Sequence, residues 1–226
     1  MRLSNSASSK AAAISFTDPC FTPDGVSLGY DVFYREYDAK EAEVSNYKTS
    51  TMGAGIRMGV PVTEYDRVNF GFTPEWMKLK LYDGAPKRYT NFVEQFDGKG
   101  STSADFLTLK ANVGWGRNKT DSALWPTRGY IMKANAEVGL PGGDIQYYKL
   151  THGQTWFFPL SKNLTLLLNG EVGYADGYGK TSELPFFHNF YGGGLGSVRG
   201  YESSSLGPKE PNGYDNDYDY MGGNMK

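Results

Sequence analysis

The sequence predicts an all-β protein: an antiparallel transmembrane β-barrel, present here as an incomplete fragment of about nine to ten strands. Three observations lead to this fold class. Apolar and polar residues alternate with a period of two, helical periodicity is absent almost everywhere, and the alternating segments run for about ten residues or more. Because successive strand side chains point to opposite faces, each segment has one apolar and one polar face.

The alternation is cleanest between residues 51 and 60, and it recurs between residues 107 and 117. In the first segment the apolar face is formed by Met52, Ala54, Ile56, Met58 and Val60. The intervening residues on the other face are small, polar or charged: Thr51, Gly53, Gly55, Arg57 and Gly59. A β-sandwich would show the same pattern with its apolar face turned inward, so the alternation alone leaves two architectures open.

Segment length and aromatic placement favour a barrel whose apolar face meets lipid. The segments are longer than the usual strand of about five or six residues, and they suit a tilted membrane strand better. Aromatic residues lie near strand ends, as in the girdles at membrane interfaces: Tyr30, Tyr34, Tyr65, Trp115, Trp125, Tyr130, Trp156 and Tyr174. Charges keep to the polar face in the best segments, which fits the cost of placing them in lipid.

We expect about nine strands, over residues 1–5 (a tail), 11–16, 26–37, 46–60, 67–83, 106–117, 128–140, 144–160 and 163–175. A tenth strand begins at Gly223. The phase slips near Pro74, which predicts a β-bulge there, and Ile145–Phe158 has ambiguous facing. Short turns alternate with longer polar connections, including residues 84–105, as in outer-membrane barrels. Because an open sheet cannot span lipid, we expect further strands outside this sequence.

Composition excludes several classes of protein. The formal net charge is −2, which gives no basic field for nucleic acid. Cys20 is the only cysteine, so a disulfide framework and a cysteine-built zinc site are excluded. No run of 18 apolar residues exists that could form a transmembrane helix. The mean hydropathy of −0.52 is typical of soluble proteins, but alternating barrel strands average to the same value.

The most informative segment is the long connection over residues 176–223. Long connections without secondary structure are uncommon and are usually functional or disordered. Glycines that let the backbone fold tightly lie at Gly192, Gly193, Gly194 and Gly196, and a permanently charged side chain follows in the motif Val198, Arg199, Gly200 and Tyr201. A buried unpaired arginine is costly, so inside a barrel Arg199 would need a carboxylate partner; otherwise it is a solvated loop residue.

No catalytic, metal or cofactor site is expected. The glycine run has neither the Gly-Lys-Ser/Thr nor the helix that a phosphate loop requires. Asp215, Asp217 and Asp219 are spaced like the start of a calcium loop, but Tyr220 occupies the position of the required glycine. His152 and His188 have no nucleophile at a recognisable spacing, so a structural role is favoured for both.

Several motifs, in order along the chain, resemble the barrel of the BamA family of outer-membrane assembly factors. They are Ser-Phe-Thr-Asp-Pro at 15–19, Asp-Gly-Val-Ser-Leu-Gly at 24–29, Pro-Val-Thr-Glu-Tyr at 61–65, Trp-Pro-Thr-Arg-Gly at 125–129, Pro-Phe-Phe-His-Asn-Phe-Tyr-Gly-Gly-Gly at 185–194 and Val-Arg-Gly-Tyr at 198–201. The resemblance implies a roughly sixteen-stranded barrel preceded by periplasmic POTRA domains. The chain would then run from late in the third strand to the start of the twelfth, without the POTRA domains and without the first and last barrel strands.

The resemblance also implies a location and a function. The chain would lie in the bacterial outer membrane and belong to a machine, not an enzyme, that folds and inserts β-barrel proteins. Its partners would be outer-membrane lipid, unfolded barrel-protein clients and, through the POTRA domains, lipoproteins of the assembly complex. Arg199 would lie in the lumen and pair with acidic residues on wall strands beyond this chain. The alternative is a related outer-membrane transporter that secretes a partner protein through the barrel.

Overall fold

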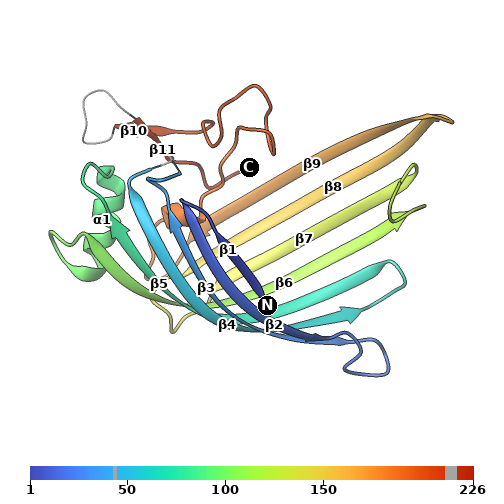
Figure 1. Cartoon of the computed structure of the whole chain (residues 1–226), viewed down its shortest axis with the longest axis horizontal. Helices are drawn as coiled ribbons and strands as arrows, with labels where there is room; N and C mark the ends of the chain where they lie inside the picture. The colour runs from blue at the N-terminus through green and yellow to red at the C-terminus, as the bar shows by residue number, and fades with distance from the viewer. Residues whose placement is uncertain (43–44, 212–217) are drawn as a thin grey trace.

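The computed structural model describes residues 1–42, 45–211 and 218–226, and its main element is a nine-stranded antiparallel sheet with strands in chain order (Figure 1). The strands are β1 (Arg2–Asn5), β2 (Ser9–Asp18), β3 (Ser27–Asp38), β4 (Tyr47–Pro61), β5 (Asp66–Leu81), β6 (Ser103–Thr120), β7 (Gly129–Gly139), β8 (Tyr147–Ser161) and β9 (Leu164–Gly177). A separate pair, β10 (Lys209–Pro211) and β11 (Tyr218–Tyr220), lies in the connection after β9. The prediction of an antiparallel β-sheet is confirmed, and β1 and β9 form the two edges of a sheet that stays open within the described residues.

Both ends of the sheet extend the predicted pattern. Residues 2–5, within the tail counted as the first strand, form β1, which pairs with β2 from Arg2↔Ala13 to Asn5↔Lys10. At the other edge, the backbone of Gly173 in β9 exchanges two hydrogen bonds of 2.9 Å with Lys226. The amide of Ala175 donates to the carbonyl of Asn224 at 2.8 Å. The last residues therefore start to pair with β9, where the tenth strand was predicted.

The apolar rows of the strands lie on the outer face, which we define as the face opposite α1 (Lys87–Asp97) and the segment after β9. Large outer side chains are exposed: Ile14, Phe16, Val32, Met52, Ile56, Phe70, Phe72, Val113, Leu150, Leu166, Leu168 and Val172. On β6 this row extends from Leu107 to Trp115, with Asp105 and Arg117 beyond its two ends. At about 3.4 Å per residue and a tilt of about 40°, these charges stand roughly 30 Å apart along the membrane normal, which matches a hydrocarbon core.

The predicted bulge at Pro74 is wrong. Pairing with β6 runs without a shift through Thr73↔Lys110, Pro74↔Leu109 and Glu75↔Thr108. Trp76 continues the outer apolar row, while Leu79 and Leu81 lie on the inner face and are buried. The apparent slip of phase therefore arises because the inner face itself becomes apolar toward the long-connection end of the sheet.

Residues 84–105, expected to be a longer polar connection, contain the helix α1 at their centre, which the sequence pattern did not predict. Pro86 precedes the helix, where its fixed φ suits a helix start, and Gly98 ends it with φ 90°. The helix buries Tyr89 and Val93, one turn apart, against the inner face of the sheet. In the part of the chain that the structure describes, no helix is long and apolar enough to cross a membrane.

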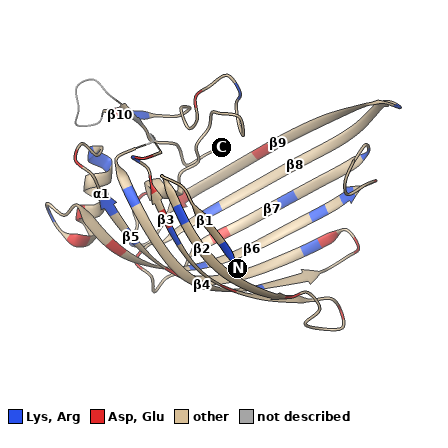
Figure 2. Ribbon diagram, in the orientation of Figure 1, with Lys and Arg blue, Asp and Glu red and all other residues tan. Residues whose placement is uncertain are grey.

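The buried core lies at one end of the inner face. It joins Leu79 and Leu81 of β5, Ala104 and Phe106 of β6, and Tyr147 of β8 to side chains of α1 and of the segment after β9. Toward the opposite end the inner face is polar and open, with a hollow of about 440 Å³ lined in part by Lys133, Asn135 and Glu171. Charged positions lie at strand ends and on α1, and also near the middle of strands such as β7 and β9 (Figure 2).

Candidate functional site

The candidate site is the segment after β9, which returns over the inner face and is anchored there by aromatic side chains. A short 3-10 helix, η1 (Phe186–His188), inserts Phe186 between the sheet and α1. The ring of Phe186 stacks on that of Tyr89 with centroids 3.8 Å apart, and it meets Tyr47 edge-on at 5.1 Å. Phe92 of α1 packs against it at 5.8 Å. These contacts join β4, α1 and the long connection in one buried cluster.

His188 forms the second anchor. Its ring stacks on Tyr147 of β8 with centroids 4.1 Å apart, and its backbone carbonyl accepts a 2.9 Å hydrogen bond from Nζ of Lys149. Burial, reinforced by the positive charges of Lys149 and Lys110, lowers the pKa of His188 to about 3. The imidazole is therefore neutral at physiological pH and acts as a packed aromatic ring, as a structural role requires.

Phe190 forms the third anchor, and it explains a glycine in the wall. Its ring lies over Gly173 of β9, where an added Cβ would come within 2.7 Å of the ring. Nζ of Lys149 lies 4.3 Å from the ring centroid, close enough for a cation–π contact. The backbone of Phe190 also exchanges hydrogen bonds of 2.8 and 2.9 Å with Gly223. The long connection is thus held to the wall and to its own far end at a single residue.

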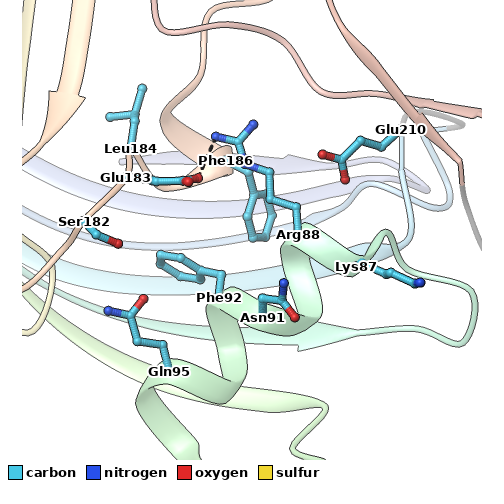
Figure 3. Close-up of a pocket in the computed structure, with 10 residues that line it drawn as sticks. All are labelled: Lys87, Arg88, Asn91, Phe92, Gln95, Ser182, Glu183, Leu184, Phe186 and Glu210. Carbon is cyan, nitrogen blue, oxygen red and sulfur yellow. Dashed lines mark ion pairs between the residues drawn. The ribbon is translucent and has the colours of Figure 1, made fainter.

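Polar contacts complete the attachment to α1. Arg88 and Glu183 form an ion pair of 3.1 Å across a pocket of about 650 Å³, whose floor includes Phe92 and Phe186 (Figure 3). Glu210 lies at another side of the same pocket. Both signs of charge line the space, so it does not select an anion or a cation. We interpret it as the junction between α1 and the segment after β9.

The glycine run folds the chain back on itself. Gly192 pairs with Leu206, and the amide of Gly194 donates to the carbonyl of Tyr201 at 3.1 Å. Gly193 and Gly194 have φ of 105° and 89°, which residues with a side chain rarely adopt. An added Cβ on either would also meet residues 202–205 of the returning segment. An added Cβ on Gly196 would meet nothing within 4 Å, so neither its φ nor its surroundings require glycine at this position.

The predicted motif lies at the outer tip of this fold-back. Val198 and Tyr201 are 44% and 56% exposed, Arg199 is exposed, and Gly200 has φ 91°. Within residues 1–42, 45–211 and 218–226, no ion pair of Arg199 is recorded. The structure therefore brings the glycines and the motif together, and the lumenal pairing of Arg199 stays a prediction.

The glycines and the motif at the tip were predicted to be functional, whereas the anchoring role of the aromatic residues before them was not. The signal was present as closely spaced aromatic residues, Phe186, Phe187 and Phe190, just before the glycines. Asp215 and Asp217 of the calcium-like spacing lie outside the described residues, as does the side chain of Asp219. Among the residues that are described, no group of three or more histidine, cysteine or acidic side chains could hold a metal ion.

Comparison with known proteins assigns the family. The whole chain, residues 1–226, matches the Omp85 superfamily domain. The chain belongs to the Omp85 superfamily. It is 58% identical over its full length to the outer membrane protein assembly factor BamA of Neisseria meningitidis serogroup B, and covers 29% of that protein. It is 30% identical, over 87% of its length, to the factor of the same name from Nitratidesulfovibrio vulgaris, of which it covers 23%.

A solved structure shows the same architecture. The crystal structure of BamA from Haemophilus ducreyi lacking POTRA domains 1-3 superposes with a TM-score of 0.81 at 28% identity, over 96% of this chain and 43% of the other. The chain thus spans less than a third of the length of the curated relatives that it matches. It is part of a β-barrel of the outer membrane of Gram-negative bacteria.

We predict that Gly173→Ala in the full-length protein displaces Phe190, because the new Cβ occupies the space of its ring. Residues 190–207 should then be cleaved faster by an added protease in detergent-solubilised protein. Gly153→Ala on neighbouring β8 is the matched control, since its added Cβ meets nothing closer than 3.9 Å. Equal cleavage rates for the two variants would contradict this account of the anchor.

We predict that docking of η1 weakens as the pH falls below about 6.5. The undocked imidazole takes up a proton near its ordinary pKa of 6.5, whereas the docked imidazole stays neutral until the pH falls to its lowered pKa of about 3. The docked state therefore loses about 2 kcal/mol between pH 7 and pH 5. Amide hydrogen exchange of residues 185–190, corrected for its intrinsic pH dependence, measures this loss.

The variant His188→Phe, which retains an aromatic ring without a titrating group, is the control for this effect. Its corrected exchange should be independent of pH over the same range. His152, the other histidine of this chain, is retained in both proteins. The same pH dependence in His188→Phe as in the parent protein would assign the effect to another group.

Proposed function

We propose that the longer protein containing this chain folds and inserts β-barrel proteins into the outer membrane, and that this chain supplies barrel wall and a bracing loop. The observation that carries the proposal is the 58% identity over the whole chain to a protein named an outer membrane protein assembly factor. A second relative, at 30% identity, bears the same name. These names favour assembly over the alternative of a transporter that secretes a partner through the lumen.

The proposed activity needs no bond chemistry, so we propose that the protein is not an enzyme. A client strand in lipid has backbone amides and carbonyls that only another strand can satisfy. A barrel edge can offer its own strand as a pairing template. On this proposal the partners are membrane lipid and unfolded barrel-protein clients, with lipoproteins of the assembly complex bound through POTRA domains.

We further propose that residues 1–226 form part of one barrel domain whose first and last strands lie elsewhere in the longer protein. Barrel closure is required because each unpaired edge in lipid leaves a row of peptide groups without partners. The open edge of β1 and the short pairing of β9 with residues 224–226 support this proposal, since both leave ladder positions to be filled.

In this proposal Arg199 is the tip of a brace that spans the lumen. The aromatic anchors hold the base of the loop on one wall, and the glycine fold-back leaves Arg199 exposed at its tip. A carboxylate on a wall strand beyond this chain would complete the brace, and a bidentate pair suits the planar guanidinium. Val198 and Tyr201, both partly exposed at the tip, would pack beside that pair.

The test is Arg199→Ala in the full-length protein. We expect slower assembly of client barrels in reconstituted membranes and faster protease cleavage of the loop tip, because one end of the brace is released. Arg199→Lys keeps the charge but loses the bidentate fork, so an intermediate effect is expected. Client assembly and loop protection that both match the parent protein would contradict the brace, whereas failure of the parent itself to assemble clients would contradict the function.

A further inference from the structure

A second feature lies on the outer face, at the end of the sheet that carries the long connections. Cross-strand pairing places its side chains in rows that run around the barrel. The row nearest mid-sheet is apolar and consists of Ala12, Tyr34, Met52, Trp76 and Leu107. The next row toward the loops is Lys10, Glu36, Ser50, Lys78 and Asp105, and above it stand Asp38, Lys48, Lys80 and Ser103. The apolar surface therefore ends at a band that contains four lysines.

The two lower rows enclose a hollow. Its volume is about 340 Å³, and it is lined by Tyr34, Ser50, Met52, Trp76, Met77, Lys78 and Asp105. Ser50 is small and stands directly opposite Glu36 on one side and Lys78 on the other, so the surface dips between them. Met52 and Trp76 are 57% and 54% exposed, and both therefore present apolar area to whatever lies outside the barrel.

The four lysines of the band lie among three carboxylates, Glu36, Asp38 and Asp105, so the band carries one positive charge in excess. Glu36 is shared by two lysines, with Nζ of Lys48 at 3.0 Å and Nζ of Lys10 at 3.6 Å. Lys48 also stands directly opposite Lys80, and like charges in that arrangement destabilise a sheet. For Lys80 no ion pair is recorded in the described part of the chain, and the pair of Lys78 with Asp105 is long, at 3.8 Å. An anion at this place would remove the repulsion.

We propose that this hollow and its lysines bind a phosphorylated glycolipid of the outer leaflet, the lipid A part of lipopolysaccharide. The longer loops of outer-membrane barrels face the cell exterior, so the lysine band lies at the level of the outer-leaflet headgroups. Acyl chains lie on Tyr34, Met52 and Trp76, and phosphate oxygens accept hydrogen bonds from the ammonium groups of Lys78 and Lys80.

Lipid A fits the spacing better than a phospholipid with one phosphate. Lys10 and Lys78 stand in the same row three strand spacings apart, which is about 14 Å at about 4.8 Å per strand, too far for one phosphate to lie between them. A headgroup with two phosphates on a sugar scaffold can engage separate lysines at once, while its several acyl chains cover the wide apolar row below. The site belongs to the wall, so it is independent of the proposed role in assembly.

The experiment uses the full-length protein in detergent, with native mass spectrometry to count bound bis-phosphorylated, hexa-acylated lipid A. In Lys78→Ser/Lys80→Ser the affinity should fall about thirtyfold, since each basic residue at a membrane surface strengthens binding of anionic lipid about fivefold. The matched control is Lys119→Ser/Lys162→Ser, which removes two lysines at the short-turn end. Folding of each variant is checked by the migration of unheated protein in gels.

Two further lipids and one further variant distinguish the contribution of the phosphates from that of the apolar hollow. Lipid A without phosphates should bind the parent protein as weakly as bis-phosphorylated lipid A binds the double variant, and dioleoyl phosphatidylglycerol should bind weakly to both. Ser50→Phe, which fills the hollow and keeps every lysine, should also reduce lipid A binding. Equal lipid A binding by the parent and the Lys78/Lys80 variant would overturn the proposal. Preferential binding of phosphatidylglycerol by the parent would overturn it in favour of a phospholipid site.

Discussion

Hydrogen bonding of the backbone in lipid is the constraint on which the rest of this structure depends. No water reaches the bilayer core, so each amide and carbonyl must be paired within the protein. The nine strands meet this requirement with antiparallel ladders between chain neighbours, without a crossover. Once the ladder is fixed, the pleat assigns alternate side chains to lipid and to lumen, which is why Val113 is exposed on the outside while Asn112 and Gly114 face inward.

The same constraint determines how the inside is built. A wide barrel cannot fill its lumen with wall side chains alone, so loops supply the missing volume. Here Phe186 and Tyr89 come from two different connections and stack on each other above Tyr47 of the wall. Gly173 provides the space for Phe190, so a wall glycine that would weaken an ordinary strand is explained by what docks on it. The wall and the loop are therefore specified together.

The sequence predicts the wall well because alternation is a local property. The outward rows, the strand order and the start of pairing at residues 224–226 all follow from period two and from chain adjacency. The errors come from the inner face. Leu79 and Leu81 point inward only because α1 covers them, and α1 is held by contacts with Phe186 about a hundred residues away. Nothing near Pro74 or Tyr89 in the sequence indicates that contact, so a bulge was predicted at Pro74 and the helix α1 was not predicted.

The orientation of the two faces can be measured directly in membranes. In the full-length protein, with Cys20 replaced by serine, single nitroxide labels would be placed at each position from 107 to 117 of β6. At odd positions such as 109 and 113, the spin relaxation of the label should be accelerated mainly by oxygen dissolved in the lipid. At even positions such as 112 and 114, it should be accelerated mainly by a water-soluble nickel complex. Reversed phase, or equal exposure of odd and even positions to the nickel complex, would contradict this orientation.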